Sequence, residues 1–481
     1  MDKQATHLAA LEPMSALLEA QRQAYRADPY PSCELRLDRL RRLGEITTHY
    51  TDQLVAAIAE DFGHRSPHET RLTDLLMIES AIVHAARHLR SWMKTRRVHT
   101  ALHYLPGTNR LMSQPLGLVG VIAPWNYPYQ LAMGPTIAAI AAGNRVMIKP
   151  SEYTPIFSAL LERLVARHFS QDELAVVNGG MEVAQAFSSL PFDHLVFTGS
   201  TATGRHVAMA AARNLTPVTL ELGGKSPAII DASADLASAA RSLAFGKLLN
   251  AGQTCIAPDY VLVPAHLRDA LAEQIARAMQ DMYGQQAGNA DYTAIINQRH
   301  FARLDVLVDD AVEQGARALY PVFGRDAAER EQAGRKFSPT LLLDVRPDMR
   351  VMQEEIFGPI LPLVSYGGEV DEAIAFVNAR DRPLALYWYG RDTRHRDRVL
   401  TQTVSGGVTV NDCIWHFGQE SQPFGGVGAS GMGAYHGQWG FRAFSKEKPV
   451  FLQSRINGIG LLHPPYGKTI EFMMRLLRAI A

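Results

Sequence analysis

The sequence lacks an excess of charge of either sign, and it contains little cysteine. Lysine and arginine together number 48, as do aspartate and glutamate, so the formal net charge is zero. Without a basic surplus, we expect no nucleic-acid partner. The three cysteines, Cys33, Cys255 and Cys413, form no C-x-x-C pair, which argues against a zinc site or a disulfide framework. We therefore expect no bound metal and a reducing, cytoplasmic compartment.

Long apolar runs are also missing. No stretch reaches the roughly 18 residues that a membrane span needs, so we expect no membrane span. The opening MDKQATHLAALEPM lacks the basic and apolar regions of a signal peptide. The tail, residues 456–481, ends in TIEFMMRLLRAIA, which is apolar and lightly basic. We expect this tail to form a helix docked on the protein rather than one lying on a membrane surface.

The sequence does contain alternating strand and helix patterns. Residues 1–97 are typical of charged helices, and short apolar runs with helical stretches between them follow from residue 116. This alternation predicts an α/β fold with parallel sheets. A second series of such runs begins after residue 225, so we expect two domains joined near residues 222–226. The predicted strands are 116–124, 144–150, 174–179, 194–200, 217–224, 259–264, 340–345, 359–366 and 406–411.

A glycine-rich stretch near the C-terminus contains the spacing G-x-G-x-x-G at Gly426, Gly428 and Gly431. That spacing marks a dinucleotide-binding turn only when a strand precedes it and a helix follows. Neither pattern flanks it here, and further glycines interrupt the residues that follow. We interpret it as a loop whose backbone passes close to another segment.

Two other segments are better candidates for a cofactor site. In VFTGSTATGR (196–205), a strand ends at Thr198 and Gly199 opens a turn, after which Ser200 can cap a helix. The segment predicts either a phosphate site at the helix N-terminus or an ordinary turn. Lys149 and Glu152 follow another strand and fit either ribose binding or a surface ion pair.

Single residues leave more alternatives open. Cys255 lies among small residues in NAGQTCIAP, where a thiolate has room to attack a carbonyl carbon, but a structural cysteine fits equally. His84 and His88 lie one helical turn apart without an H-E-x-x-H pattern around them. We interpret that pair as a helix surface rather than a metal site.

Taken together, the motifs resemble the aldehyde dehydrogenase superfamily from about residue 10 to about residue 460, and within it the class 3 branch. The chain is similar to the bacterial coniferyl aldehyde dehydrogenases and to fatty or aromatic aldehyde dehydrogenases of that branch. The motifs occur in the family's order, and they are PWNYP (124–128), KPSE (149–152), FTGSTATG (197–204), LELGGKSP (220–227), GQTC (252–255), EEIFGP (354–359) and PFGGVGASGMG (423–433).

The resemblance implies oxidation of an aldehyde by NAD, or by NADP, through a covalent cysteine intermediate. It implies that Cys255 is the nucleophile, Glu221 the general base for hydrolysis, and Asn126 an oxyanion donor together with the Cys255 backbone N–H. It also implies a cofactor site and a substrate pocket. The implied cofactor residues are Lys149, Glu152, Gly199, Ser200, Gly204, Glu355 and Phe357, and the implied pocket residues are Tyr127, Trp415, His416 and Phe424.

The resemblance further implies two Rossmann-like parallel-sheet domains and a small β projection that joins two subunits into a homodimer. The expected NAD-binding domain comprises 1–97 and 116–222, and the expected catalytic domain comprises 223–415. Segments 98–115 and 439–455 would form the projection, and 416–438 a glycine-rich loop on the substrate side. Two alternatives remain, a CoA-acylating aldehyde dehydrogenase and a non-catalytic binding protein on the same scaffold.

Overall fold

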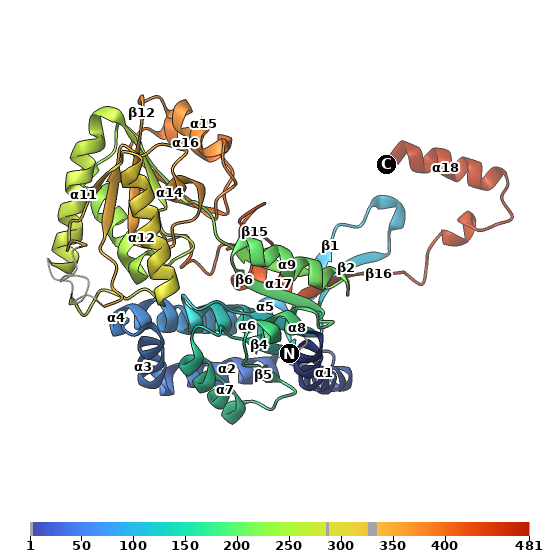
Figure 1. Cartoon of the computed structure of the whole chain (residues 1–481). Coiled ribbons are helices and arrows are strands. Elements are labelled where there is room, and N and C mark those ends of the chain that lie inside the picture. Colours follow the sequence, from blue (N-terminus) through green and yellow to red (C-terminus); the bar gives the residue numbers. More distant parts are fainter. Residues whose placement is uncertain (1–2, 285–287, 326–333, 481) are drawn as a thin grey trace.

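A six-stranded sheet forms the centre of the first domain in the computed structural model, which describes residues 3–284, 288–325 and 334–480 (Figure 1). The strand order is β15-β7-β6-β3-β4-β5, and all neighbours are parallel except β15, which runs antiparallel to β7. The strands are β3 (Leu118–Ile122), β4 (Arg145–Lys149), β5 (Leu174–Val176), β6 (His194–Gly199), β7 (Val218–Leu222) and β15 (Gly431–Met432).

Helices surround this first sheet. The helix α6 is buried along nearly its whole length because it lies between the sheet and the helices α2 and α5. The sequence predicted this buried helix, and the prediction is confirmed. The helical elements are α1 (Lys3–Ala27), α2 (Cys33–His49), α3 (Thr51–Phe62), α4 (Pro67–Thr70), the π-helical turn η1 (Arg71–Leu75), α5 (Leu76–Trp92), α6 (Pro128–Ala142), α7 (Pro155–His168), α8 (Met181–Ser188) and α9 (Thr201–Ala212).

The second domain contains a seven-stranded sheet with the order β10-β11-β12-β9-β8-β13-β14, parallel except for the edge strand β10. Its strands are β8 (Pro227–Ile230), β9 (Tyr260–Pro264), β10 (Arg317–Leu319), β11 (Thr340–Leu343), β12 (Ile360–Tyr366), β13 (Ala385–Tyr389) and β14 (Gly407–Val410). Its helical elements are α10 (Leu236–Leu248), η3 (Leu249–Gly252), η4 (Ala265–Leu267), α11 (Arg268–Tyr283), α12 (Gln298–Glu313), α14 (Arg350–Gln353), α15 (Val370–Asn378) and α16 (Thr393–Gln402).

A three-stranded antiparallel sheet projects from the body, as expected for a small β projection. It has the order β1-β2-β16, and the turn η2 lies between its first two strands. The elements are β1 (Arg96–Val98), η2 (Leu102–Tyr104), β2 (Thr108–Pro115) and β16 (Ser445–Leu452). The helix α17 (Gly437–Ala443) packs on α5 and α6, so the strand portion of 439–455 begins only at Ser445.

The C-terminal tail ends in a helix, as expected. After η5 (Ile459–Leu462), the helix α18 (Lys468–Ile480) lies beyond the projection and apart from both domains (Figure 1). It contacts η2 of the projection, and Phe472 and Met474 are exposed to solvent. The docking expected of this helix is therefore found on the projection of its own chain and not on the two domains, because the chain leaves them through β16. No helix in the described ranges is long and apolar enough to cross a membrane.

The glycine-rich stretch near the C-terminus is a close backbone approach, as its composition predicted. Gly431 pairs with Glu221 across β15 and β7, and a Cβ at Gly431 would overlap the carbonyl oxygen of Leu220. Gly428, in the same loop, has a φ of 67°. Of the three glycines in the G-x-G-x-x-G spacing, Gly431 is the one that makes the contact between this loop and β7.

We expect Gly431→Ala to destabilise the protein more than Gly428→Ala. Both residues have positive φ, but a Cβ at Gly428 would meet only Arg382 Cδ at 3.7 Å. Gly428→Ala should therefore cost about 1 kcal/mol from backbone strain alone. Gly431→Ala adds the overlap with Leu220 and should cost at least about 2 kcal/mol. Urea unfolding measures both costs, and equal costs would contradict the close approach.

Candidate active site

The candidate nucleophile follows an unusual turn. Asn250, Ala251 and Gly252 in η3 have φ values of 53°, 51° and 73° in succession. A Cβ at Gly252 would overlap the carbonyl oxygen of Gly358, so only glycine fits there. This left-handed turn ends α10 abruptly and carries the chain to Cys255, a half-buried free thiol.

Asn126 lies opposite this turn, in the loop between β3 and α6. Its Nδ2 donates to the carbonyl oxygen of Gln253 at 3.1 Å. An amide NH₂ carries two hydrogens, so one remains for a developing oxyanion. The backbone N–H groups of Cys255 and Ile256 face the sulfur and lower its pKa slightly against the larger effect of burial.

Glu221 supplies a carboxylate from within β7. The residue is buried, and neither carboxylate oxygen has a hydrogen-bond partner within the described part of the chain. Burial raises the pKa of Glu221 well above its usual value. Burial and the nearby carboxylates of Glu355 and Glu221 raise the pKa of the Cys255 thiol to about 12. The site therefore contains a thiol and a base in a medium that disfavours charge on both.

Two cavities meet at these groups. One has a volume of about 200 Å³ and the other about 250 Å³, and Cys255, Glu221, Thr198 and Leu222 line both. The first cavity is strongly apolar, and the second contains Asn126, Ser200 and Glu355. A thiol at such a junction can bond to a group in one cavity while a second molecule occupies the other.

The second cavity fits a dinucleotide. It is lined by Gly199 and Ser200 at the N-terminus of α9, where Ser200 Oγ accepts from the Thr203 N–H at 3.3 Å. Such a helix N-terminus favours phosphate. Glu355 and Phe357 line the opposite wall, and a Cβ at Gly223 would overlap the Glu355 carboxylate. The absence of a side chain at Gly223 therefore leaves room for the Glu355 carboxylate in the cavity wall.

Three of the residues implied to bind the cofactor do not line the second cavity. Lys149 and Glu152 form an ion pair at 3.7 Å at the end of β4 and are not among the residues that line the cavity. Gly204 is buried against Leu222, where a side chain would separate α9 from β7. Gly204 therefore serves helix–sheet packing, as the last glycine of a dinucleotide-binding turn does, and its implied contact with the cofactor stays a prediction.

The apolar cavity contains three of the four implied substrate residues. Tyr127 and Phe424 are buried in its wall, whereas Trp415 is 55% exposed at its mouth and donates to Asp412 Oδ2 at 2.8 Å. His416 does not line the cavity. Its Nδ1 is 2.8 Å from Thr409 Oγ1, and its ring stacks on Phe424 from behind. The pocket role implied for His416 is therefore indirect.

Several wall residues carry no signal in the sequence. Leu72, Thr73 and Met77 come from the N-terminal helices and line the apolar cavity, and His300 and Arg303 of α12 line the other. Each lies far along the chain from the motifs, so only folding brings it to the site. The rings of His84 and His88 lie with their centroids 4.3 Å apart and their planes tilted by 37°. Within the described residues, no three His, Cys, Asp or Glu side chains are grouped to hold a metal.

Comparison with known proteins gives the family. The aldehyde dehydrogenase family model matches residues 5–450. The chain belongs to the aldehyde dehydrogenase family. It is 50% identical to a "Probable coniferyl aldehyde dehydrogenase" of Pseudomonas aeruginosa, over 95% of this chain and 94% of that one. It is 45% identical to a "Coniferyl aldehyde dehydrogenase" of a Pseudomonas species, over 97% and 96% of the two chains.

Solved structures of aldehyde dehydrogenases share the fold. The substrate-bound state of Staphylococcus aureus AldH has a TM-score of 0.91 at 37% identity, covering 96% of this chain and 99% of that one. An NAD-dependent aldehyde dehydrogenase from Sinorhizobium meliloti has a TM-score of 0.82 at 28% identity, covering 94% and 88%. The chain is thus an NAD(P)-dependent aldehyde dehydrogenase, as the sequence motifs predicted.

The raised pKa of Cys255 predicts how the cofactor-free thiol reacts. Because that pKa is about 12, alkylation by iodoacetamide should be slow near neutral pH. Its rate should rise about tenfold per pH unit through the alkaline range, since only the thiolate reacts. Glu355→Gln removes a negative charge near the sulfur and should accelerate alkylation. Cys255→Ala reports the background from Cys33 and Cys413, and a plateau below about pH 9 would contradict the prediction.

Proposed function

We propose that this aldehyde dehydrogenase oxidises aromatic and other large apolar aldehydes to carboxylic acids, with Cys255 as nucleophile and Glu221 as hydrolytic base. The observation that supports the proposal is the junction of an apolar and a polar cavity at Cys255 and Glu221. An aldehyde in the apolar cavity presents its carbonyl carbon to the thiol. The residues that would hold the nicotinamide end of the cofactor, Glu355 and Phe357, line the second cavity beside the same sulfur.

The chain's own groups account for the chemical steps. Cys255 gives its thiol proton to water as Sγ bonds to the aldehyde carbon, and the resulting oxyanion accepts hydrogen bonds from the Asn126 amide and the Cys255 backbone N–H. Bound NAD supplies the hydride acceptor. Departure of hydride leaves a thioester on Cys255. Glu221 then accepts a proton from water as that water attacks the thioester. When the C–S bond breaks, Glu221 returns the proton to the sulfur, and the carboxylic acid leaves the free thiol.

The presence of Glu221 at the cavity junction favours hydrolysis over transfer to CoA. A CoA-acylating enzyme needs no base for water, because the CoA thiol attacks the thioester. Here the Glu221 carboxylate is buried beside the sulfur, and neither of its oxygens has a hydrogen-bond partner in the described part of the chain. Its raised pKa makes it a stronger base toward water than an exposed carboxylate. The same pair of groups argues against a non-catalytic role.

We propose NAD as the preferred cofactor, with NADP also accepted. Lys149 and Glu152 lie at the carboxyl end of β4, where an adenosine ribose is bound in a sheet of this type. A carboxylate at that position repels a 2′-phosphate, whereas Lys149 Nζ attracts one. Because the two charges are paired, the discrimination against NADP is modest.

We also propose a homodimer formed through the projection. Leu102, Leu105, Phe451 and Leu452 on the projection are exposed in the single chain, as is Phe472 of α18. A second copy related by two-fold symmetry would bury this apolar surface. A cytoplasmic location fits a mechanism that depends on a reduced thiol.

Replacing Glu221 by glutamine should separate the two halves of the reaction. The variant should still form the thioester and release one equivalent of NADH rapidly, and hydrolysis should then limit turnover. Stopped-flow absorbance would show a burst followed by a steady state slowed about 100-fold or more. Cys255→Ala is the control and should show neither phase. Full steady-state turnover of the Glu221→Gln variant would show that Glu221 is not the hydrolytic base.

Substrate selectivity tests the apolar cavity. Aromatic stacking contributes about 0.5–1.5 kcal/mol per pair beyond burial, so two contacts correspond to about tenfold in kcat/KM. We expect kcat/KM for coniferyl-type aldehydes to exceed that for acetaldehyde by at least this factor. Trp415→Ala should narrow the ratio, whereas Trp439→Ala, on α17 outside the cavity lining, should not. Equal kcat/KM for the two aldehydes would refute the assignment.

A further inference from the structure

A fully buried ion pair lies beside the active site but outside the proposed chemistry. Arg65 Nη2 is 2.9 Å from Asp74 Oδ2, and both side chains are completely inaccessible to solvent. Removing two charges from water costs several kcal/mol per ion, and their attraction often fails to repay it. The pair is therefore weak support for stability by itself. The other hydrogen bonds of Arg65 and Asp74 indicate a role in fixing the nearby backbone.

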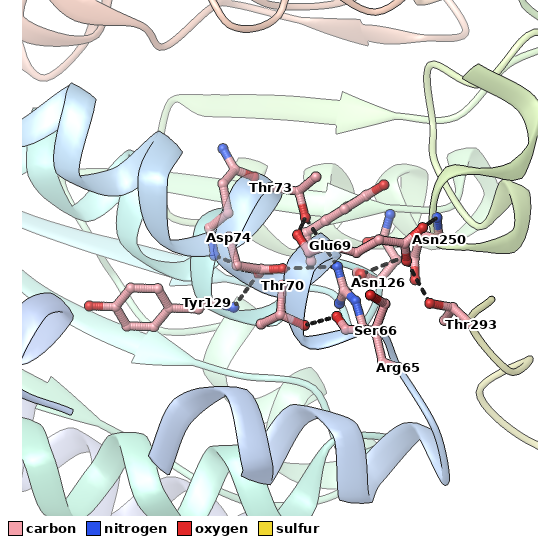
Figure 2. A network of polar contacts seen from close by, with 12 residues as sticks. Arg65, Ser66, Glu69, Thr70, Thr73, Asp74, Asn126, Tyr129, Asn250 and Thr293 are labelled. Carbon is pink, nitrogen blue, oxygen red and sulfur yellow. Dashed lines mark hydrogen bonds and ion pairs between the residues drawn. The ribbon is translucent and has the colours of Figure 1, made fainter. Parts of the chain in front are cut away.

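The pair is bonded to the backbone on both sides of Pro128. Asp74 Oδ1 accepts from the N–H groups of Tyr129 and Gln130 at 3.2 and 3.1 Å, which caps the N-terminus of α6 from outside. Arg65 Nη1 donates to the carbonyl oxygen of Asn126 at 3.1 Å. The backbone that carries the Asn126 amide is thus held through both members of the pair (Figure 2).

Glu69 connects the same region to the second domain. It lies on α4, between Arg65 and Asp74 in the sequence. Its Oε1 accepts from the Asn250 N–H at 3.1 Å, and its Oε2 accepts from Thr293 Oγ1 at 2.5 Å (Figure 2). Both donors belong to the second domain. Asn250 is also the first residue of the left-handed turn that leads to Cys255.

The Asn250 side chain completes the connection. Its Nδ2 donates to the carbonyl oxygen of Asn126 at 2.9 Å and to that of Gln253 at 3.2 Å. The Asn126 oxygen therefore accepts one hydrogen bond from each domain, from Arg65 and from Asn250. The oxyanion donor belongs to the first domain and the nucleophile to the second, so their separation depends on how the domains meet at this oxygen.

We propose that Arg65, Glu69 and Asp74 are positioning residues that together form a clamp across the domain boundary and hold the Asn126 amide in register with Cys255. This inference rests on the roles proposed above for Asn126 and Cys255. In this proposal, none of the three clamp residues touches the substrate or the cofactor. They act by fixing two backbone segments, the one before α6 and the one before Cys255.

The clamp also reaches the substrate cavity. Arg65 Nη2 is within 3.3 Å of Thr73 Oγ1, and Thr73 donates to the Glu69 carbonyl oxygen at 2.8 Å. Thr73 and Leu72 lie on the π-helical turn η1 and line the apolar cavity. Wide turns of this kind are frequent at functional sites. Loss of the clamp should therefore affect the chemical step and, to a smaller degree, aldehyde binding.

The test compares Glu69→Ala with Glu69→Gln. Alanine removes both acceptors, whereas glutamine keeps an oxygen for the Asn250 N–H and places an amide beside the Thr293 hydroxyl, which can accept. Misplacing a catalytic group by about 1 Å can cost about 100-fold. We expect Glu69→Ala to lower kcat 10- to 100-fold per titrated active site with little change in the KM for NAD, and Glu69→Gln to retain most activity.

A matched control separates positioning from stability. Glu173 accepts from both Arg39 and Arg42 at 2.9 Å, in a largely buried group of three charges in the first domain, remote from the site. Glu173→Gln should lower the thermal midpoint without changing kcat at low temperature. If Glu69→Ala loses activity only in proportion to its unfolded fraction, as Glu173→Gln is expected to, the clamp is purely structural and the proposal is overturned.

A double variant shows whether Glu69 acts through Asn126. If it does, adding Glu69→Ala to Asn126→Ala should lower the NADH burst rate less than twofold further, whereas independent effects would multiply. Multiplying effects would overturn the proposal. The alkylation rate of Cys255 reports the turn without reference to the reaction, and Glu69→Ala should change it severalfold. An Asn126→Ala variant with normal turnover would instead refute the proposed function while leaving the alkylation result to decide the clamp.

Discussion

The carbonyl oxygen of Asn126 is the point on which the geometry of the active site depends. It accepts hydrogen bonds from Arg65 in the first domain and from Asn250 in the second. The amide of the same residue faces the turn that carries Cys255. Because one residue both receives the domain contact and carries the amide that we propose for the oxyanion, the relative placement of the domains and the proposed geometry of the reaction are linked.

The arrangement of the sheets explains why so many active-site groups converge there. Asn126, Gly199 and Glu221 lie at the carboxyl ends of strands in the first sheet, where parallel sheets bind ligands. Cys255 and Glu355 lie before β9 and β12, at the amino ends of strands in the second sheet. The two edges face each other across the cavities, and neither edge contains a complete site.

Burial shifts the pKa values of the active-site groups and strengthens their hydrogen bonds. Glu221, Glu355 and Cys255 all have raised pKa values because water is largely excluded around them. The same exclusion strengthens each hydrogen bond to a developing charge. A site with these properties requires rigid support, which the left-handed turn at Asn250 and the close approach of the glycine-rich loop to β7 provide.

The sequence by itself determined the family and the fold class, because the family's motifs are short and contiguous. The catalytic roles of Cys255, Glu221 and Asn126, which lie in those motifs, stay predictions. The sequence also predicted the strands β3, β4, β5, β6, β7, β9, β11, β12 and β14. It did not reveal β8 or β13, whose short, fully buried apolar runs have no period to distinguish them from a helix interior. Tertiary structure alone placed His416 behind Phe424, Gly204 in helix packing and α18 away from the body. It alone brought Arg65, Glu69, Leu72 and Arg303 to the site, because contacts between segments far apart along the chain, such as Arg65 with Asn126 and Glu69 with Asn250, leave no local pattern.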